Sequence, residues 1–229
     1  MSQSSFPTEF QYVLSNLSTS SLELIKQTYN KLSPDFQTEF EAYSHALSEI
    51  MKNNAAKENV IQYLAVKVWF ICGHLDWILD IGSRLSHPGA KSYYALALLF
   101  KGDSKQAIDI LECLRSRDPY FRMEILGLLS FCYSVTRKYK KVEKIFKEIK
   151  QIQSLPFFKN NPLIAQEGYV WGLTRYAYTI RAMGDLERAL EMIEQAQQFS
   201  LELNSRHLQI LALLIFGQCL ENRAIFICF

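Results

Sequence analysis

The chain is 229 residues long and carries a formal net charge of +2, with 49% hydrophobic and 21% charged residues. This length supports a sizeable core in one or two domains, and nine Gly and six Pro are too few for an all-β protein with its frequent turns. The near-neutral charge argues against a nucleic-acid footprint over the whole molecule, and no apolar run reaches the roughly 18 residues of a membrane span. Residues 1–5 lack the basic and apolar regions of a secretion signal, so we expect an intracellular protein, cytoplasmic or nuclear.

The N-terminal part of the chain predicts two helices that cap the rest of the molecule or join a partner. Ser20 followed by Glu23 matches a capping box, which predicts a helix over 21–32. Ser33-Pro34 predicts an N-cap and a first-turn proline for a second helix that ends near Asn53. We therefore assign 1–54 to an N-terminal helical segment and 55–229 to a second domain.

From about residue 57 onward the same turn signal recurs between apolar helices. The turn positions are Gly73, Gly102, Arg137 and Gly184. Five residues after each turn position comes a side chain that we expect in the core: Ile78, Ala107, Val142 and Ala189. Ala107 and Val142 are 35 residues apart, and a helix pair that recurs at such an interval predicts a solenoid of stacked hairpins.

These units resemble the tetratricopeptide repeat (TPR), whose pattern is a large residue, Leu-Gly, Tyr, a turn, Ala and Phe. The best unit has Leu126, Leu129, Ser130 and Tyr133 before its turn, and Val142, Phe146 and Ile149 after it. The resemblance covers about 57–204 and implies an all-α, right-handed α-solenoid of antiparallel hairpins; an irregular helical bundle is the alternative. No unit carries the Trp of the family, and the longer interval from Val142 to Ala189 predicts an extended connection near 154–163.

The end of the sequence predicts the first helix of one further unit. Its apolar positions are Leu208, Leu211, Ala212, Ile215, Phe216, Cys219 and Leu220. The sequence then ends on the apolar residues 225–229, whereas a solenoid normally ends in a cap with a polar outer face. We expect either a shortened chain or a surface that a partner covers, so the C-terminal helix is a candidate place of association.

The first helix of each hairpin would line a groove that binds peptides or partner helices. Subtracting the packing positions leaves side chains of the types that dominate interface hot spots. The predicted partner-binding residues are Trp171, Arg175, Tyr178 and Arg181, with Leu128 and Phe131 from the preceding unit. If Ser92, Leu96 and Leu99 are also exposed, the groove continues as an apolar trough. The alternative is that Trp171 and Tyr178 pack on the connection at 154–163 and the arginines are solvated.

Some members of this family grip the C-terminal carboxylate of chaperones with a clamp that requires Asn. The matching positions here are Leu96, Phe131 and Tyr178. Because none of them is Asn, we do not expect chaperone-tail binding.

Charge is uneven along the predicted solenoid. Residues 137–150 include seven basic and two acidic residues, whereas 185–202 include five acidic residues and one Arg. The ordinary interpretation is a solvated helix face, and the alternative is a patch for an acidic partner at Lys140, Lys144 and Lys147. Because no aromatic residues interleave with these lysines, sequence-specific nucleic-acid recognition is not expected.

The sequence contains no motif for phosphate, dinucleotide or acyl-enzyme chemistry. Its five Cys and four His show no local metal-ligand spacing, so we expect no catalytic residue, metal or cofactor. These observations favour a non-enzymatic scaffold or adaptor of a multiprotein complex. The alternatives are a ligand- or peptide-sensing regulatory domain that controls a separate effector, and a helical enzyme without a known motif.

Overall fold

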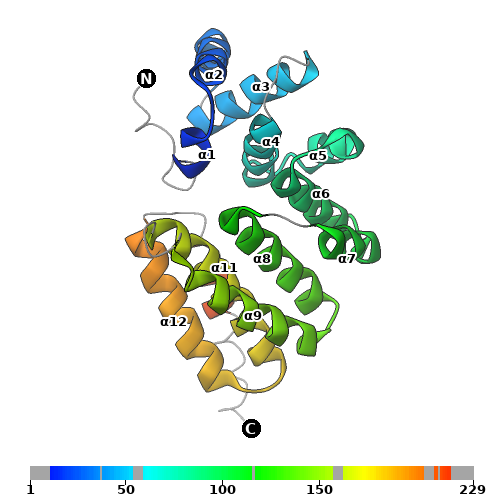
Figure 1. Cartoon of the computed structure of the whole chain (residues 1–229), viewed down its shortest axis with the longest axis vertical. Helices are drawn as coiled ribbons and strands as arrows, with labels where there is room; N and C mark the ends of the chain where they lie inside the picture. The colour runs from blue at the N-terminus through cyan, green and yellow to red at the C-terminus, as the bar shows by residue number, and fades with distance from the viewer. Residues whose placement is uncertain are drawn as a thin grey trace. The chain divides into compact units, whose positions relative to one another are not determined.

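A computed structural model describes residues 11–36, 38–53, 59–114, 117–156, 162–203, 209–210 and 212–217. Within these ranges the chain forms helices and turns and no strand, and consecutive helices of the same compact unit pack antiparallel (Figure 1). This confirms the all-α prediction. The chain divides into two compact units, Met1–Leu114 and Arg115–Phe229, called unit 1 and unit 2 below. Among the described helices, none combines the length and the apolar character that crossing a membrane requires.

Unit 1 is built of helices that pack on their neighbours in chain order. Its elements are α1 (Gln11–Ser15), α2 (Thr19–Leu32), η3 (Ser33–Asp35), α3 (Glu39–Lys52), α4 (Asn59–Ile71), α5 (Leu75–Ile81), η4 (Gly82–Arg84), α6 (Pro88–Phe100) and α7 (Ser104–Cys113). α2 packs on α3, α3 packs on α4, and α6 packs on α4, α5 and α7. The Trp69 indole of α4 donates from Nε1 to the Ser44 carbonyl of α3 at 3.0 Å. The predicted 1–54 segment therefore shares one compact unit with the first two hairpins.

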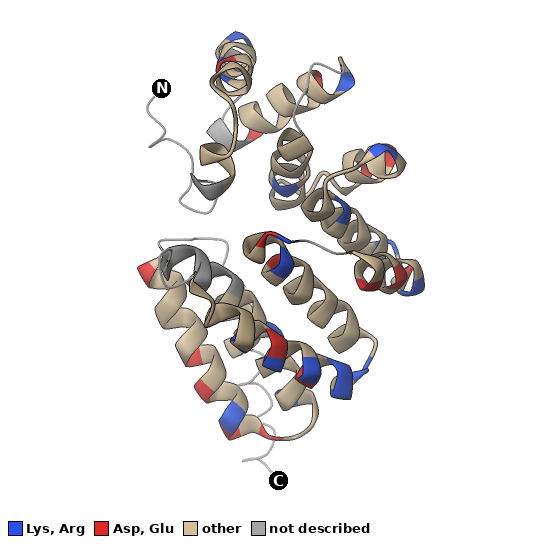
Figure 2. Ribbon diagram, viewed as in Figure 1, with Lys and Arg blue, Asp and Glu red and all other residues tan. Residues whose placement is uncertain are grey.

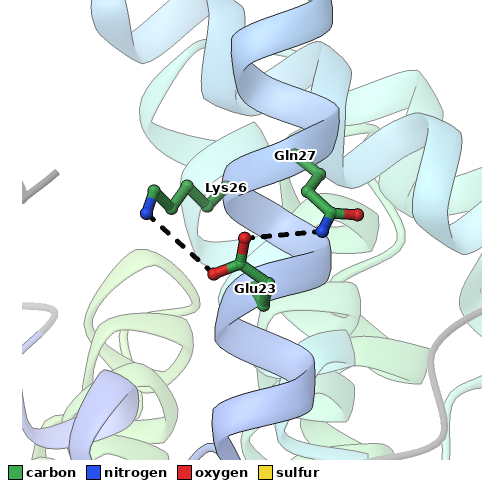
Figure 3. A network of polar contacts seen from close by, with 3 residues as sticks. All are labelled: Glu23, Lys26 and Gln27. Carbon is green, nitrogen blue, oxygen red and sulfur yellow. Dashed lines mark hydrogen bonds and ion pairs between the residues drawn. The ribbon is translucent and has the colours of Figure 1, made fainter.

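The start of α2 differs from the prediction. Ser18 is its N-cap, because the Ser18 Oγ accepts a hydrogen bond from the Ser21 amide at 3.2 Å. Glu23 makes no capping box with Ser20; its carboxylate lies 4.0 Å from the Lys26 ammonium and accepts from the Gln27 amide at 3.4 Å (Figure 3). The capping-box assignment was wrong because Ser18, two residues before Ser20, also has a hydroxyl oxygen that can accept a hydrogen bond from a free amide at the start of the helix.

The start of α3 also differs, whereas its end agrees. Ser33-Pro34 opens the short η3 rather than a long helix. α3 begins after Thr38, whose Oγ1 accepts from the Glu41 amide at 3.2 Å, and it ends at Lys52, next to the predicted Asn53. A proline in the first turn suits a 3₁₀-helix as well as an α-helix, so the Ser-Pro signal alone could not separate the two.

Unit 2 is organised around α11. Its helices are α8 (Pro119–Val135), α9 (Tyr139–Gln153), α11 (Pro162–Ala182) and α12 (Leu186–Glu202), and residues 209–210 and 212–217 are also helical. α11 packs against α8, α9 and α12 (Figure 1). A Cβ at Gly172 would lie 3.2 Å from the Ile149 side chain, and one at Gly127 would lie 3.3 Å from the Trp171 Cβ. The missing side chains at these two glycines let α11 approach α9 and α8 closely.

Four hairpin turns share one hydrogen-bonded geometry. In α4–α5, α6–α7, α8–α9 and α11–α12 the turn residue has positive φ: Gly73 (+79°), Gly102 (+94°), Arg137 (+57°) and Gly184 (+93°). The amide after each turn residue bonds to a carbonyl five residues earlier, as from Asp103 to Leu98 at 3.0 Å. The turn residue itself bonds three residues back, as from Gly102 to Leu99 at 3.0 Å. Both bonds together define a Schellman turn.

The side chains expected in the core after these turns are buried. Ile78, Ala107, Val142 and Ala189 are each fully buried, which confirms their predicted inward position. The small residues of the first helices are also buried: Ala95, Ser130 and Ala177. Small side chains at these positions let the helices of a hairpin pack at short range, while Tyr133 and Phe146 fill the adjacent space in unit 2.

The predicted C-terminal helix is described in part. Ala212 and Ile215 are buried, as predicted. Ile210, Leu213 and Leu214 are 57–60% exposed. Leu208, Leu211, Cys219, Leu220 and residues 225–229 lie outside the described residues.

Candidate functional site

The six predicted partner-binding residues lie on α8 and α11, which pack side by side in unit 2. Leu128 and Trp171 are buried in this packing, and Arg175 is only 8% exposed. Phe131, Tyr178 and Arg181 are half-buried. Phe131, Tyr178 and Arg181 are therefore open to solvent in part, whereas Leu128 and Trp171 are covered.

Arg175 lies among aromatic rings. Its guanidinium carbon is 3.8 Å from the centroid of the Phe131 ring and 5.3 Å from that of the Trp171 ring. Ser134 on α8 and Thr179 on α11 share a hydrogen bond of 2.8 Å, which holds the two helices together one turn farther along. The structure thus brings together Phe131, Trp171 and Arg175, three of the residues that the sequence selected.

A second arginine–ring pair lies near the C-terminal end of α11. The guanidinium carbon of Arg181 is 5.1 Å from the centroid of the Tyr178 ring. Both residues are half-buried, so this pair combines a cation, an aromatic face and access from solvent.

The electrostatics of the α8–α11 face follow from its burial. Burial lowers the pKa of Arg175 to about 10. The neighbouring Cys132 thiol has its pKa raised to about 12, chiefly by burial, with the positive Arg175 opposing the shift. The Nε atoms of Arg175 and Arg181 are buried, and no described residue accepts a hydrogen bond from either.

The predicted apolar trough is not exposed. Ser92, Leu96 and Leu99 are buried within unit 1, and in unit 2 the exposed apolar position on α8 is Val135, at 48%. The repeat pattern identifies only the side chains that pack within a hairpin. The first helix of each hairpin also packs against the first helix of a neighbouring hairpin, and this second contact buries further side chains. Arg175 is buried, so the alternative interpretation with solvated arginines is wrong for this residue. The other part of that alternative, packing of Trp171 and Tyr178 on the connection, involves residues 157–161, which lie outside the described residues.

The predicted lysine patch lies on the solvent side of α9. Lys140, Lys144 and Lys147 are exposed, and Lys147 lies 3.8 Å from the Glu143 carboxylate in an ion pair open to water. Figure 2 shows the basic residues along α9 and the acidic residues along α12 of the same unit. The positions suit either a solvated face or an acidic partner, and the role of the patch stays a prediction.

Sequence reasoning missed a pocket in unit 1. It has a volume of about 330 Å³ and lies between the end of α2, α3 and α5. Its walls include the rings of Phe36, His45 and Trp77, and its rim carries Glu49 and Lys52. Only the spacing of Glu49 and Lys52 on one helix face was visible in the sequence, and such pairs are common on solvated helices.

An aromatic cluster forms one side of this pocket. His45 stacks on Phe36 at 4.4 Å between ring centroids, and Trp77 stacks on His74 at 4.2 Å. Burial, followed by the proximity of His45, lowers the pKa of His74. Protonation of His74 is therefore disfavoured by its surroundings.

No group of three His, Cys, Asp or Glu side chains in the described part of the chain is arranged to hold a metal ion. No protein-family model, curated protein or solved structure matches the chain significantly. Any functional assignment therefore depends on the geometry above.

Proposed function

We propose that this protein is a non-enzymatic interaction scaffold or adaptor, built as a right-handed, TPR-like α-solenoid with the N-terminal helices as a cap. The single observation that supports it best is the fourfold recurrence of one Schellman turn, each followed five residues later by a buried side chain. Recurring helix pairs of this kind leave long helix faces for partner binding. No catalytic role is assigned to any residue.

The proposed contact surface on unit 2 is the α8–α11 face around Phe131, Tyr178 and Arg181. These residues are half-buried, and aromatic and arginine side chains supply large contact areas while keeping their hydrogen-bonding capacity. The partner element is a peptide or a helix with an apolar anchor for Phe131 and Tyr178. The lysines of α9 offer a second, electrostatic contact for an acidic partner, and the exposed residues of the 209–217 helix offer a third.

The proposal is tested by selecting binders from a displayed peptide library with the full chain. Peptides selected on the native protein should lose at least about tenfold in affinity for the Tyr178→Ala/Arg181→Glu double variant, as expected when hot-spot contacts are lost. Arg175→Glu is unsuitable here, because it would bury a carboxylate in place of a stacked cation.

The matched control is Arg188→Glu, which reverses the charge of an exposed arginine on α12, outside the proposed contact surfaces. This variant should retain the selected peptides, and circular dichroism should show unchanged helicity for both variants. Equal binding of the peptides to the Tyr178/Arg181 variant would contradict the assigned surface, and failure to select any peptide would contradict the scaffold proposal.

A ligand-sensing domain is the second candidate, and the pocket of unit 1 favours it. The pocket combines aromatic walls with one acidic and one basic rim residue, which is the composition of many small-molecule sites. A thermal-shift screen with small metabolites tests it: saturable stabilisation that Trp77→Ala removes would favour sensing over scaffolding.

A further inference from the structure

Arg175 is a largely buried cation without an anion beside it among the described residues. The residue is 8% exposed, and its Nε is buried without an acceptor among the described residues. The contacts that it does make are to the rings of Phe131 and Trp171. The face of an aromatic ring attracts a guanidinium, but it does not accept hydrogen bonds from the five N–H groups as an oxygen atom does.

Neither the Cys132 thiol nor a described carboxylate neutralises Arg175. The Cys132 thiol stays protonated near neutral pH, because burial raises its pKa to about 12. On α9, Glu148 binds Arg122 at 2.6 Å and Glu143 lies 3.8 Å from Lys147. No described carboxylate forms an ion pair with Arg175.

Buried charges in folded proteins are nearly always paired, and an unpaired buried donor calls for a specific explanation. The planar guanidinium is also the group best suited to hold a carboxylate or a phosphate with two parallel hydrogen bonds. The Phe131 ring lies 3.8 Å from the guanidinium carbon, measured to the ring centroid, and this contact helps to hold the guanidinium in place before any ligand arrives.

We propose that Arg175 is the receptor for one oxyanion, a carboxylate or a phosphate, carried by the protein segment that binds the α8–α11 face. The anion reaches the guanidinium through the small part of the side chain that remains exposed. This inference deepens the proposed function and rests on it, since the oxyanion belongs to the bound partner. It adds a chemical requirement to the partner, namely an acidic or phosphorylated residue next to its apolar anchors.

The test uses the isolated full chain and two probes, inorganic phosphate and glutarate, each titrated at constant ionic strength. Arginine Nε–H signals are followed by ¹⁵N NMR, and the signal of Arg175 is identified by its loss in Arg175→Lys. We expect that signal to shift saturably, and the midpoint of thermal unfolding to rise with the same saturation. Arg175→Lys keeps the charge but not the fork, so its affinity for the probe should fall about tenfold or more.

Arg188→Met is the matched control. Arg188 also lies near a ring, with its guanidinium carbon 5.6 Å from the centroid of Tyr176 and an Nη2 hydrogen bond of 3.2 Å to the Tyr176 hydroxyl, but it is exposed. This variant should keep the full response to both probes, whereas Arg175→Met should lose it. If Arg175→Met fails to fold, the NMR titration of the native chain remains decisive.

A response to phosphate alone would identify a phosphorylated partner segment, and a response to glutarate, with or without phosphate, would identify an acidic one. An Arg175 signal that stays unchanged with both probes would overturn the proposal, as would a thermal response that Arg175→Met retains. The titration needs no partner, so its failure leaves the peptide selection on Tyr178 and Arg181 as a separate test of the proposed function.

Discussion

At the scale of single residues, Arg137 occupies a turn position that the other three hairpins give to glycine. Its φ is +57°, in the left-handed region that costs a side-chain-bearing residue about 1–2 kcal/mol. We therefore expect Arg137→Gly to raise the free energy of unfolding by up to about 1 kcal/mol, part of the gain being lost to the greater freedom of glycine in the unfolded chain. Urea denaturation followed by circular dichroism measures the change.

The complementary substitution is Gly102→Ala. Nothing lies within 4 Å of a Cβ built at Gly102, where φ is +94°, so only backbone strain should act. The free energy of unfolding should fall by about 1–2 kcal/mol. If Arg137→Gly and Gly102→Ala changed the free energy of unfolding in the same direction, that result would argue against left-handed turns at these two positions.

The described cysteines should differ in reactivity, because the thiolate is the reactive form. Burial raises the pKa of Cys132 to about 12 and also raises that of the half-buried Cys72, whereas Cys113 is exposed. With a pKa near 12, about one Cys132 thiol in ten thousand is ionised at pH 8. Iodoacetamide labelling followed by peptide mass spectrometry should modify Cys113 first, Cys72 more slowly and Cys132 only on unfolding. Rapid labelling of Cys132 in the native protein would show that α8 is not packed as described.

The burial of a residue was predictable where it follows from the periodicity of its own helix. It was not predictable where it results from the packing of a second helix. The buried positions after each turn followed from spacing along a single helix. Arg175 and Leu128 were expected on the surface, yet both are buried. Their burial comes from the packing of α8 on α11, which lie far apart in sequence, and no periodicity within either helix reports it.

At the scale of helices, the approach of α11 to α9 depends on a glycine. A Cβ at Gly172 would lie 3.2 Å from two carbons of the Ile149 side chain. Gly172→Leu should therefore overpack this contact and lower the free energy of unfolding by about 1–3 kcal/mol. Chemical denaturation of the single variant and of Gly172→Leu/Ile149→Ala measures the coupling, and the double variant should lose less stability than the sum of the two single ones.

Gly217→Leu is the control, because no described residue lies within 4 Å of a Cβ at that helical position. Leucine is the better helix former there, so stability should stay level or rise by up to about 1 kcal/mol. If Gly172→Leu and Gly217→Leu lowered the free energy of unfolding equally, the loss would come from replacing any helical glycine and not from overpacking the α9–α11 contact.

Helix ends were predictable where glycine supplies the signal and less so where serine does. Gly73, Gly102 and Gly184 ended helices as expected, because few other residues adopt positive φ without strain. The starts of α2 and α3 were displaced, since Ser18 and Thr38 compete with Ser20 and Ser33 as caps. Several neighbouring hydroxyls can each accept the same free amide, and the sequence does not rank them.

At the scale of the whole molecule, the division at Leu114 predicts two independently folding parts. Each unit contains two of the four Schellman hairpins and its own buried residues. We expect the fragments 1–114 and 115–229 to be helical and to unfold cooperatively in calorimetry. The control pair 1–137 and 138–229, which separates α8 from α9 within one hairpin, should lose cooperative unfolding in the 138–229 part. Cooperative folding of 138–229 together with failure of 115–229 would contradict the division.

The helical class and the hairpin order of the molecule were predictable, since both depend on local periodicity and turns. The pocket at Trp77 was not, because it joins residues from α2, α3 and α5 that share no motif. For the same reason, only three of the six side chains expected at the proposed partner-binding surface are half-buried rather than buried.

Hydrogen exchange at four amides tests the repeated hairpin most directly. The amides of His74, Asp103, Lys138 and Asp185 each donate to a carbonyl five residues earlier, at 2.8–3.2 Å, and this bond forms only when the residue before them adopts the left-handed turn. We predict that NMR detects slowed exchange at all four amides in the native chain. Exchange at the rate of an unstructured peptide at two or more of them would contradict the repeat on which the proposed function depends.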